Sequence, residues 1–277
     1  MTINVEVVKH SVTQGGKEII TAALTYHRYI HGEVMTHRVL SRNAMSSRAM
    51  PVAKMLKQVW SNPATPVHWG ANQPGMQARA ELQGWRRAAA KALWKWSSMS
   101  ACFFSWAMNK VGLAKQVANR PLEPYQWMVA LVTATEWDNF FELRDHPDAQ
   151  PEFQVLAKDM RKAFTASKPQ VLLPGQWHLP FIYDREQQHY GVMAACSISA
   201  ARCARVSYLN HDGTNPSPMK DLALFDRLVG SKPLHASPVE HQATPGDKDT
   251  GNFVGWTQYR KLLERDVTFG KSVRHAV

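Results

Sequence analysis

Alternating apolar and polar positions at the start of the chain predict a β-hairpin. Ile3, Val5 and Val7 alternate with polar residues, residues 13–17 have the composition of a turn, and residues 18–26 resume the alternation. Successive side chains of a strand point to opposite faces, so this pattern is typical of two strands joined by a tight connection. An apolar run rich in β-branched residues, 128–135, predicts a further buried strand, although a buried helix gives the same signal at this length.

Apolar spacings of three and four predict helices elsewhere in the chain. The aromatics of the first predicted helix, Trp85, Trp96 and Trp106 among them, are expected in the core or at a subunit interface rather than around a cofactor. No internal repeat or sharp boundary divides the chain, which favours a single domain over residues 1–277. The predicted helices are 77–117, 135–144, 151–166 and 219–229, with loops around 63–75 and 169–184.

Charge points to an anionic partner. The 277 residues carry 33 Lys and Arg against 22 Asp and Glu, a formal net charge of +11. The basic residues are spread along the chain, without a run of five and without a recognisable DNA- or RNA-binding motif, which argues against nucleic acid. Phosphorylated small molecules fit the same charge.

The spacing of the three cysteines indicates that they are inert. Cys102, Cys196 and Cys203 show no C-x-x-C spacing, so neither a disulfide framework nor a zinc site is predicted, and a reducing cytoplasm is expected. No window has the apolar length of a membrane span, and residues 1–6 lack the features of a signal peptide, so we expect a soluble intracellular protein without membrane contact.

Common catalytic signatures are missing from the sequence. It contains no G-x-G-x-x-G, G-x-x-x-x-G-K-[ST], H-E-x-x-H or G-x-S-x-G. His235 and His241 are six residues apart, a spacing that places them on no common helix face, and no third ligand is evident. We therefore expect no metal site.

A short polar segment, residues 36–48, is the strongest candidate for binding chemistry. It gathers three arginines, a histidine, an asparagine and three serines, and includes His37, Arg38 and Arg48. Guanidinium groups and hydroxyls form charge-assisted hydrogen bonds to phosphate, so a nucleotide or a phosphorylated cofactor is the expected partner.

This segment resembles the signature of the flavin-dependent thymidylate synthases, R-H-R-x-x-S-x-N-x-x-S-x-R. Two positions depart from the pattern: Thr36 stands where the family has Arg, and Ala44 stands where it usually has Glu. The matching residues are His37, Arg38, Ser41, Asn43, Ser46 and Arg48.

Four further segments strengthen the resemblance. Residues 139–144 followed by 148–152 are similar to the family's N-F-x-x-L-R…H-A-Q-x-E segment, and Arg120 is similar to an arginine that reaches the nucleotide of a neighbouring subunit. Residues 204–208 (Ala-Arg-Val-Ser-Tyr) and 237–241 (Ser-Pro-Val-Glu-His) resemble segments that precede the signature in the family but follow it here. The chain is therefore predicted to be circularly permuted, which proteins tolerate because their termini usually lie close together.

The resemblance implies an α+β fold, a mixed sheet flanked by helices, and a homotetramer with active sites between subunits. It also implies conversion of dUMP to dTMP, with methylenetetrahydrofolate as one-carbon donor, reduced FAD as hydride source and NADPH as reductant. No cysteine nucleophile is needed for this chemistry, because the cofactor carries it.

Roles for individual residues follow from the same resemblance. Arg144 would polarise the pyrimidine and act as the catalytic residue. The nucleotide would further contact Glu33, Ser46, Ser47, Arg48 and Arg120, and the flavin would contact His37, Arg38, Asn43, Asn139, Ser207, Ser237 and Glu240.

The identity of the pyrimidine stays open at this point. Glu33 stands where the family commonly has Gln, and a carboxylate suits an amino donor such as that of cytosine, so dCMP is an alternative substrate. A related enzyme in which water completes the reaction would make a hydroxymethylated nucleotide. The alternative from a different functional class is a non-catalytic flavin- or nucleotide-binding protein or a basic RNA-binding module.

Overall fold

The predicted hairpin forms the centre of the fold. In the computed structural model, which describes residues 1–46, 48–75, 77–210, 213–230 and 234–268, β1 (Asn4–Thr13) and β2 (Glu18–His27) pair antiparallel. Gly16 in the turn has a φ of 77°, a left-handed conformation that glycine adopts without steric cost.

Five strands form a mixed sheet in the order β3-β4-β2-β1-β5. β4 (Trp127–Ala134) lies antiparallel beside β2, β3 (Ser41–Ala44) is antiparallel to β4 at one edge, and β5 (Gln170–Leu172) is parallel to β1 at the other. The prediction of a buried strand near 128–135 is confirmed. Both faces of β4 are covered, which explains why its apolar run is continuous rather than alternating.

Helices and a small hairpin complete the chain. A second sheet pairs β6 (Ala243–Pro245) with β7 (Trp256–Gln258). The helices are η1 (Arg28–Ile30), α1 (His31–Val34), α2 (Val52–Ser61), α3 (Gly84–Lys110), α4 (Lys115–Ala118), η2 (Arg120–Tyr125), α5 (Asp138–Arg144), α6 (Pro151–Ala166), α7 (Asp184–Tyr190), α8 (Val192–Ala204), α9 (Pro218–Val229), η3 (Ser237–Glu240) and α10 (Tyr259–Thr268).

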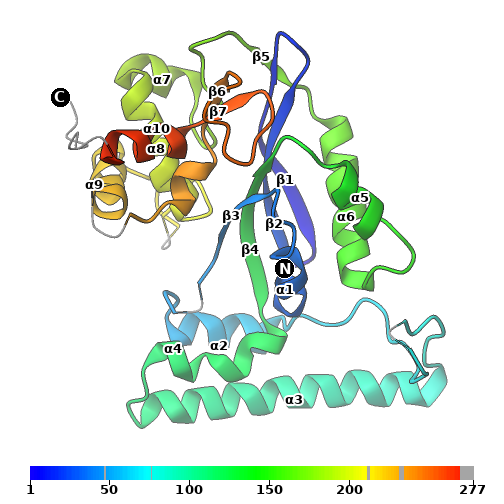
Figure 1. Cartoon of the computed structure of the whole chain (residues 1–277). Helices are drawn as coiled ribbons and strands as arrows, with labels where there is room; N and C mark the ends of the chain where they lie inside the picture. The colour runs from blue at the N-terminus through cyan, green and yellow to red at the C-terminus, as the bar shows by residue number, and fades with distance from the viewer. Residues whose placement is uncertain (47, 76, 211–212, 231–233, 269–277) are drawn as a thin grey trace.

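The two faces of the large sheet are covered by different parts of the chain (Figure 1). On one face, Ile20 and Leu24 of β2 pack in a buried cluster with Phe153 and Leu156 of α6. On the other, the segment from α7 to α10 lies against the sheet, and Ile19 belongs to a buried cluster with Trp256 and others of that segment. This is the α+β architecture, a mixed sheet flanked by helices, that the sequence led us to expect.

A buried chain of hydroxyl and imidazole groups joins the sheet to the C-terminal segment. His178 Nδ1 lies 2.9 Å from Ser11 Oγ, and its Nε2 lies 2.8 Å from Thr21 Oγ1. Thr21 Oγ1 is 2.7 Å from Thr133 Oγ1, which is 2.8 Å from His241 Nδ1. All five side chains are fully buried, so the hydrogen bonds compensate for the loss of water around polar groups.

Most of the predicted helices are confirmed, but one of them is shorter at both ends than predicted. Residues 151–166 form α6 as predicted, and the helices predicted from 219 and 135 begin at Pro218 and Asp138. The helix predicted over 77–117 is limited to Gly84–Lys110. Gly84 and Gly112 have φ values of 53° and 87°, left-handed conformations that interrupt a right-handed helix.

The α3 aromatics are predicted in the core or at a subunit interface, and several of them lie outside the core of this chain. Trp94 packs edge-on against Tyr125 at 5.2 Å between ring centroids, but Trp85, Trp96 and Trp106 are exposed in this chain. Among the residues placed by the structure, no helix is both long enough and apolar enough to cross a membrane.

Candidate functional site

Three of the predicted site residues meet at the C-terminal end of α5. Arg144 Nε donates a hydrogen bond to His37 Nε2 at 2.8 Å, and Arg144 Nη1 pairs with Glu33 Oε2 at 2.8 Å. The guanidinium lies over the ring of Phe153, 4.5 Å from its centroid. These contacts fix the plane of the guanidinium, and its position is therefore set before any ligand arrives.

His37 acts as a neutral acceptor in this cluster. Its ring is buried and packs edge-on against Phe140, 4.9 Å between centroids. Burial, followed by the charges of Arg144 and Arg42, lowers the pKa of His37 from 6.5 to about 4. Because Nε2 accepts the hydrogen bond from Arg144, the ring proton of the neutral form lies on Nδ1.

Arg42 holds the loop that carries His37, and the sequence did not single it out. Arg42 Nη1 donates to the carbonyl oxygens of Met35 at 2.7 Å and His37 at 3.0 Å. Thr36, one of the two departures from the signature, donates from Oγ1 to the Glu33 carbonyl at 2.6 Å. The loop between α1 and β3 is thus shaped by its own residues, and Thr36 takes part in shaping it.

An open cleft of about 820 Å³ adjoins this cluster. His37 and Asn139 both line it, so the structure brings two predicted flavin residues to one cavity. Buried or partly buried aromatics and a rim of polar side chains suit a planar heterocycle with polar substituents. Further lining residues are His10, Glu136, Trp137, Phe140, Phe164 and Val254.

The two segments that are out of order in the sequence pack beside the signature strand β3. Asn43 Nδ2 donates to the carbonyl of Cys203, at the start of segment 204–208, at 3.1 Å. Gln258 Nε2 donates to Ser41 Oγ and to the Glu240 carbonyl, each at 3.2 Å. Folding therefore reunites segments that are far apart in the chain, which supports the permuted arrangement.

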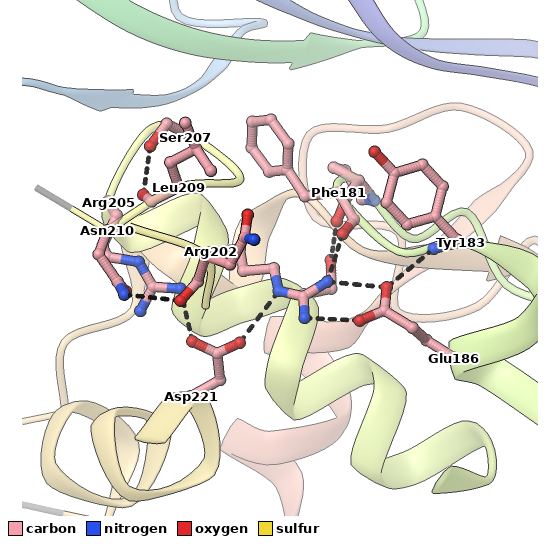
Figure 2. Close-up of polar contacts among 12 residues, drawn as sticks. Phe181, Tyr183, Glu186, Arg202, Arg205, Ser207, Leu209, Asn210 and Asp221 are labelled. Carbon is pink, nitrogen blue, oxygen red and sulfur yellow. Dashed lines mark hydrogen bonds and ion pairs between the residues drawn. The ribbon is translucent and has the colours of Figure 1, made fainter. Parts of the chain in front are cut away.

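Segment 204–208 is anchored by a buried cluster of charges (Figure 2). Asp221 accepts from Arg202 Nε at 3.0 Å and from Arg205 Nη2 at 2.5 Å, while Arg202 also binds both oxygens of Glu186. Arg202 and Asp221 are fully buried. Such a charge cluster is costly to desolvate and is stable only when each charge is paired, so it fixes the end of α8 firmly.

The turn that follows α8 is strained. Val206 has a φ of 53°, a left-handed conformation that is a true outlier for a β-branched residue. The next residue, Ser207, donates from Oγ to the Leu209 carbonyl at 2.6 Å within its own turn (Figure 2). The hydroxyl proton of Ser207 is therefore used within the turn, and its oxygen can still accept a hydrogen bond in the flavin role predicted for it.

The remaining predicted residues lie apart from the Arg144 cluster. Arg38, Ser46, Arg48 and Ser237 are exposed, and Ser47 lies outside the described residues. Arg120 pairs with Glu123 at 2.7 Å, and Glu240 pairs with Arg260. Within the described part of the chain, no hydrogen bond or ion pair links Arg48 or Arg120 to Arg144.

Arg48 and Arg120 nevertheless belong to neighbouring segments. Asn119 Nδ2 donates to the Met50 carbonyl at 3.1 Å, and Lys115 Nζ donates to the Ala49 carbonyl at 3.3 Å. These bonds hold the end of the signature loop against α4 and η2, and the two arginines are exposed on this region of the surface.

The cysteines and the His235/His241 pair do not form reactive sites. Cys102, Cys196 and Cys203 are buried, and burial raises the pKa of each thiol, most strongly for Cys196 and Cys203. His241 is buried and bonded to Thr133, whereas His235 is exposed. In the described ranges, no group of three or more His, Cys, Asp or Glu residues could hold a metal ion.

Comparison with known proteins places these observations in a family context. The model of the family described as thymidylate synthase complementing protein matches residues 18–170. This range includes Glu33, His37 and Arg144 and ends before segments 204–208 and 237–241. No curated protein matches the chain significantly.

Two solved structures are similar to this chain, and the first shares its fold. Both are of a UMP/dUMP methylase, PolB from Streptomyces cacaoi. The structure bound with 5-Br UMP has 17% sequence identity and a TM-score of 0.50, and the match covers 59% of this chain and 89% of that chain. The structure bound with 5-Br dUMP has 16% identity and a TM-score of 0.49, with coverage of 59% and 90%.

Proposed function

Because this chain belongs to the thymidylate synthase complementing protein family, we propose that it transfers a one-carbon unit to C5 of a pyrimidine deoxynucleotide, with dUMP as substrate and dTMP as product. The donor is methylenetetrahydrofolate, and NADPH reduces the flavin. The FAD supplies the hydride when it is bound. The protein supplies binding, orientation and electrostatics.

The observation that carries the proposal is the fixed guanidinium of Arg144. Its Nε is occupied by His37, its Nη1 by Glu33, and its face by Phe153. Among the residues that the structure describes, Nη2 makes one long contact, 3.5 Å to Thr36 Oγ1, so it is the donor best placed for a ring oxygen or nitrogen of the pyrimidine. A cation fixed in this way stabilises negative charge on the ring without having to reorganise.

The cleft beside His37 fits the isoalloxazine ring of the flavin. It is large enough for a heterocycle, is lined with aromatic side chains and brings His37 and Asn139 to its wall. Arg38, Ser207, Ser237 and Glu240 would bind the outer part of the cofactor. Asn43 uses its amide nitrogen on Cys203, so it would contribute through its oxygen or by holding β3 in place.

The phosphate-binding residues suggest that the site is shared. Ser46, Ser47, Arg48 and Arg120 would bind the nucleotide phosphate, but in one chain no hydrogen bond or ion pair of the described residues joins Arg48 or Arg120 to Arg144. A homotetramer in which one subunit supplies these cations to its neighbour's pyrimidine site accounts for this separation. Three free buried cysteines suit a reducing compartment, and we place the enzyme in the cytoplasm.

A second candidate substrate, dCMP, is favoured by Glu33. Its Oε2 neutralises Arg144, and its side chain is 39% exposed, so its second oxygen can accept from a 4-amino group. A neutralised arginine also gives less support to an anionic uracil ring than an unpaired arginine would.

The test begins with an absorption spectrum of the purified protein after addition of FAD. Flavin bands that remain after gel filtration are expected, and their absence would favour a non-catalytic or RNA-binding protein. Labelled dUMP and dCMP are then incubated with folate, FAD and NADPH, and the product mass is measured. Methylated product supports the proposal, hydroxymethylated product assigns the related water-terminated reaction, and unchanged nucleotides in both incubations reject the enzymatic function.

A further inference from the structure

Helix α3 has an outer face that nothing in the described part of the chain covers. Ser98, Cys102 and Ser105 form its buried side, against α2 and η2. The opposite side carries Trp85 and Trp96, which are 76% and 68% exposed. In Figure 1 α3 runs along the border of the molecule, with the other elements on one side only.

Large and small residues alternate along this outer face. The spacing of three and four residues, continued through Ser100, keeps them on one stripe of the helix. The stripe consists of Trp85, Ala89, Ala92, Trp96, Phe103 and Ala107. A stripe of this kind over 27 residues is typical of a helix that packs along its length against another helix.

We infer that α3 packs antiparallel against α3 of a second copy of this chain, with a two-fold axis at Trp96. Each residue then faces the one equally distant on the other side of Trp96. Trp85 faces the partner's Ala107, and Ala89 faces the partner's Phe103. These two pairs set a large side chain against a small one, and Trp96 meets its own copy on the axis, as interdigitated packing in an isologous interface requires.

Charge selects the antiparallel arrangement. α3 contains five basic residues and no acidic residue, and a parallel pair would place each basic residue opposite its own copy. In the antiparallel pair no basic residue lies opposite another: Lys91 faces the partner's Ala101, and Lys95 faces the partner's Ser97. Like charges directly opposite one another destabilise a pair of helices, so the parallel alternative is disfavoured.

The apolar area is sufficient for a stable contact. Exposed portions of six large side chains, counted at roughly 200 Å² per aromatic, provide on the order of 700 Å² on each copy. Specific interfaces bury roughly 600–1,000 Å² per partner, and this area lies within that range. Of the six, Trp85, Trp96 and Phe103 lie on the stripe, and Leu93, Phe104 and Trp106 flank it.

Cysteine cross-linking tests the register. Trp96→Cys places a thiol on the two-fold axis and is expected to give a covalent dimer under mild oxidation. Trp85→Cys is expected to remain monomeric on a non-reducing gel, because the two thiols are roughly 33 Å apart at 1.5 Å per residue. Mixing Trp85→Cys with Ala107→Cys restores the cross-link. The native cysteines are buried and give little background.

Light scattering coupled to gel filtration provides the second arm. Trp96→Glu should reduce the assembly mass by half or more, whereas Trp60→Glu, at another exposed tryptophan, on α2, should leave it unchanged. Cross-linking of Trp85→Cys as readily as Trp96→Cys would overturn the antiparallel register. A wild-type monomer, or a monomer that sediments with anionic vesicles through α3, would overturn the self-association.

Discussion

Arg144 Nη1 lies 2.8 Å from Glu33 Oε2, so the arginine proposed to polarise the pyrimidine is paired with a carboxylate before any nucleotide binds. The two residues are 111 positions apart in the sequence. Their pairing lowers the net charge that the site presents to the ring, and this has consequences for the choice of substrate.

Removing the carboxylate should shift the substrate preference toward uracil. Glu33→Gln leaves Arg144 with its full charge and replaces an acceptor by an amide that can also donate. We expect the ratio of kcat/KM for dUMP over dCMP to rise at least about tenfold, equivalent to ~1.4 kcal/mol. Both products are quantified by mass spectrometry in competition. Glu136→Gln, at the exposed rim of the cleft, is the matched control and should leave the ratio unchanged.

Replacing Arg144 by lysine should remove most of the activity. A lysine retains the charge but cannot contact His37, Glu33 and the ring from one planar group. Loss of about 10²- to 10³-fold in kcat is expected, as for other fixed electrostatic donors. Arg79→Lys changes an exposed arginine that pairs with Asp148, and it should retain near wild-type rates. Activity of Arg144→Lys within a few-fold of wild type would contradict the assigned role.

Acid should destabilise this fold over a defined range of pH. Burial lowers the pKa of His27 and His37 from 6.5 to about 4, and that of His241 to about 3. The unfolded chain therefore binds more protons than the folded chain below pH 6.5, and stability falls as pH decreases toward 3–4. Urea unfolding at a series of pH values should show this slope. His241→Gln should flatten it, and an identical slope would contradict the burial of a neutral His241.

The stability of the buried network of hydroxyl and imidazole groups should depend on Thr133. Thr133→Val preserves the shape of the side chain but removes the partner of both Thr21 Oγ1 and His241 Nδ1. We expect a loss of about 1–3 kcal/mol in the free energy of unfolding, because buried polar groups lose a hydrogen bond. Thr165→Val, at an exposed position on α6, serves as control and should change stability by less than about 0.5 kcal/mol.

Asp221 should be essential for the position of segment 204–208. Asp221→Asn leaves Arg202 and Arg205 without a shared counter-charge in a buried setting, and a loss of about 3–5 kcal/mol is expected. Flavin affinity, measured by fluorescence quenching under conditions where the variant is folded, should fall as well. Asp247→Asn, at an exposed position, should alter neither quantity.

The sequence by itself determined the local elements and the family. The hairpin, β4, α6 and α3 follow from periodicity, because a strand or helix that buries one face must repeat its apolar residues at its own period. The resemblance to the flavin-dependent thymidylate synthases rested on fixed spacings such as His37 to Arg48 and Asn139 to Arg144, and the family match over residues 18–170 confirms it.

Only the tertiary structure decided which of these residues meet. It paired Arg144 with Glu33 and His37, placed segments 204–208 and 237–241 beside β3, and left Arg48 and Arg120 apart from Arg144. Such contacts join residues more than a hundred positions apart, and no local pattern encodes them. The exposed stripe on α3 is a further feature that the sequence could not decide. Periodicity identifies an apolar face on this helix, but only the folded structure shows that the described part of the chain leaves that face uncovered.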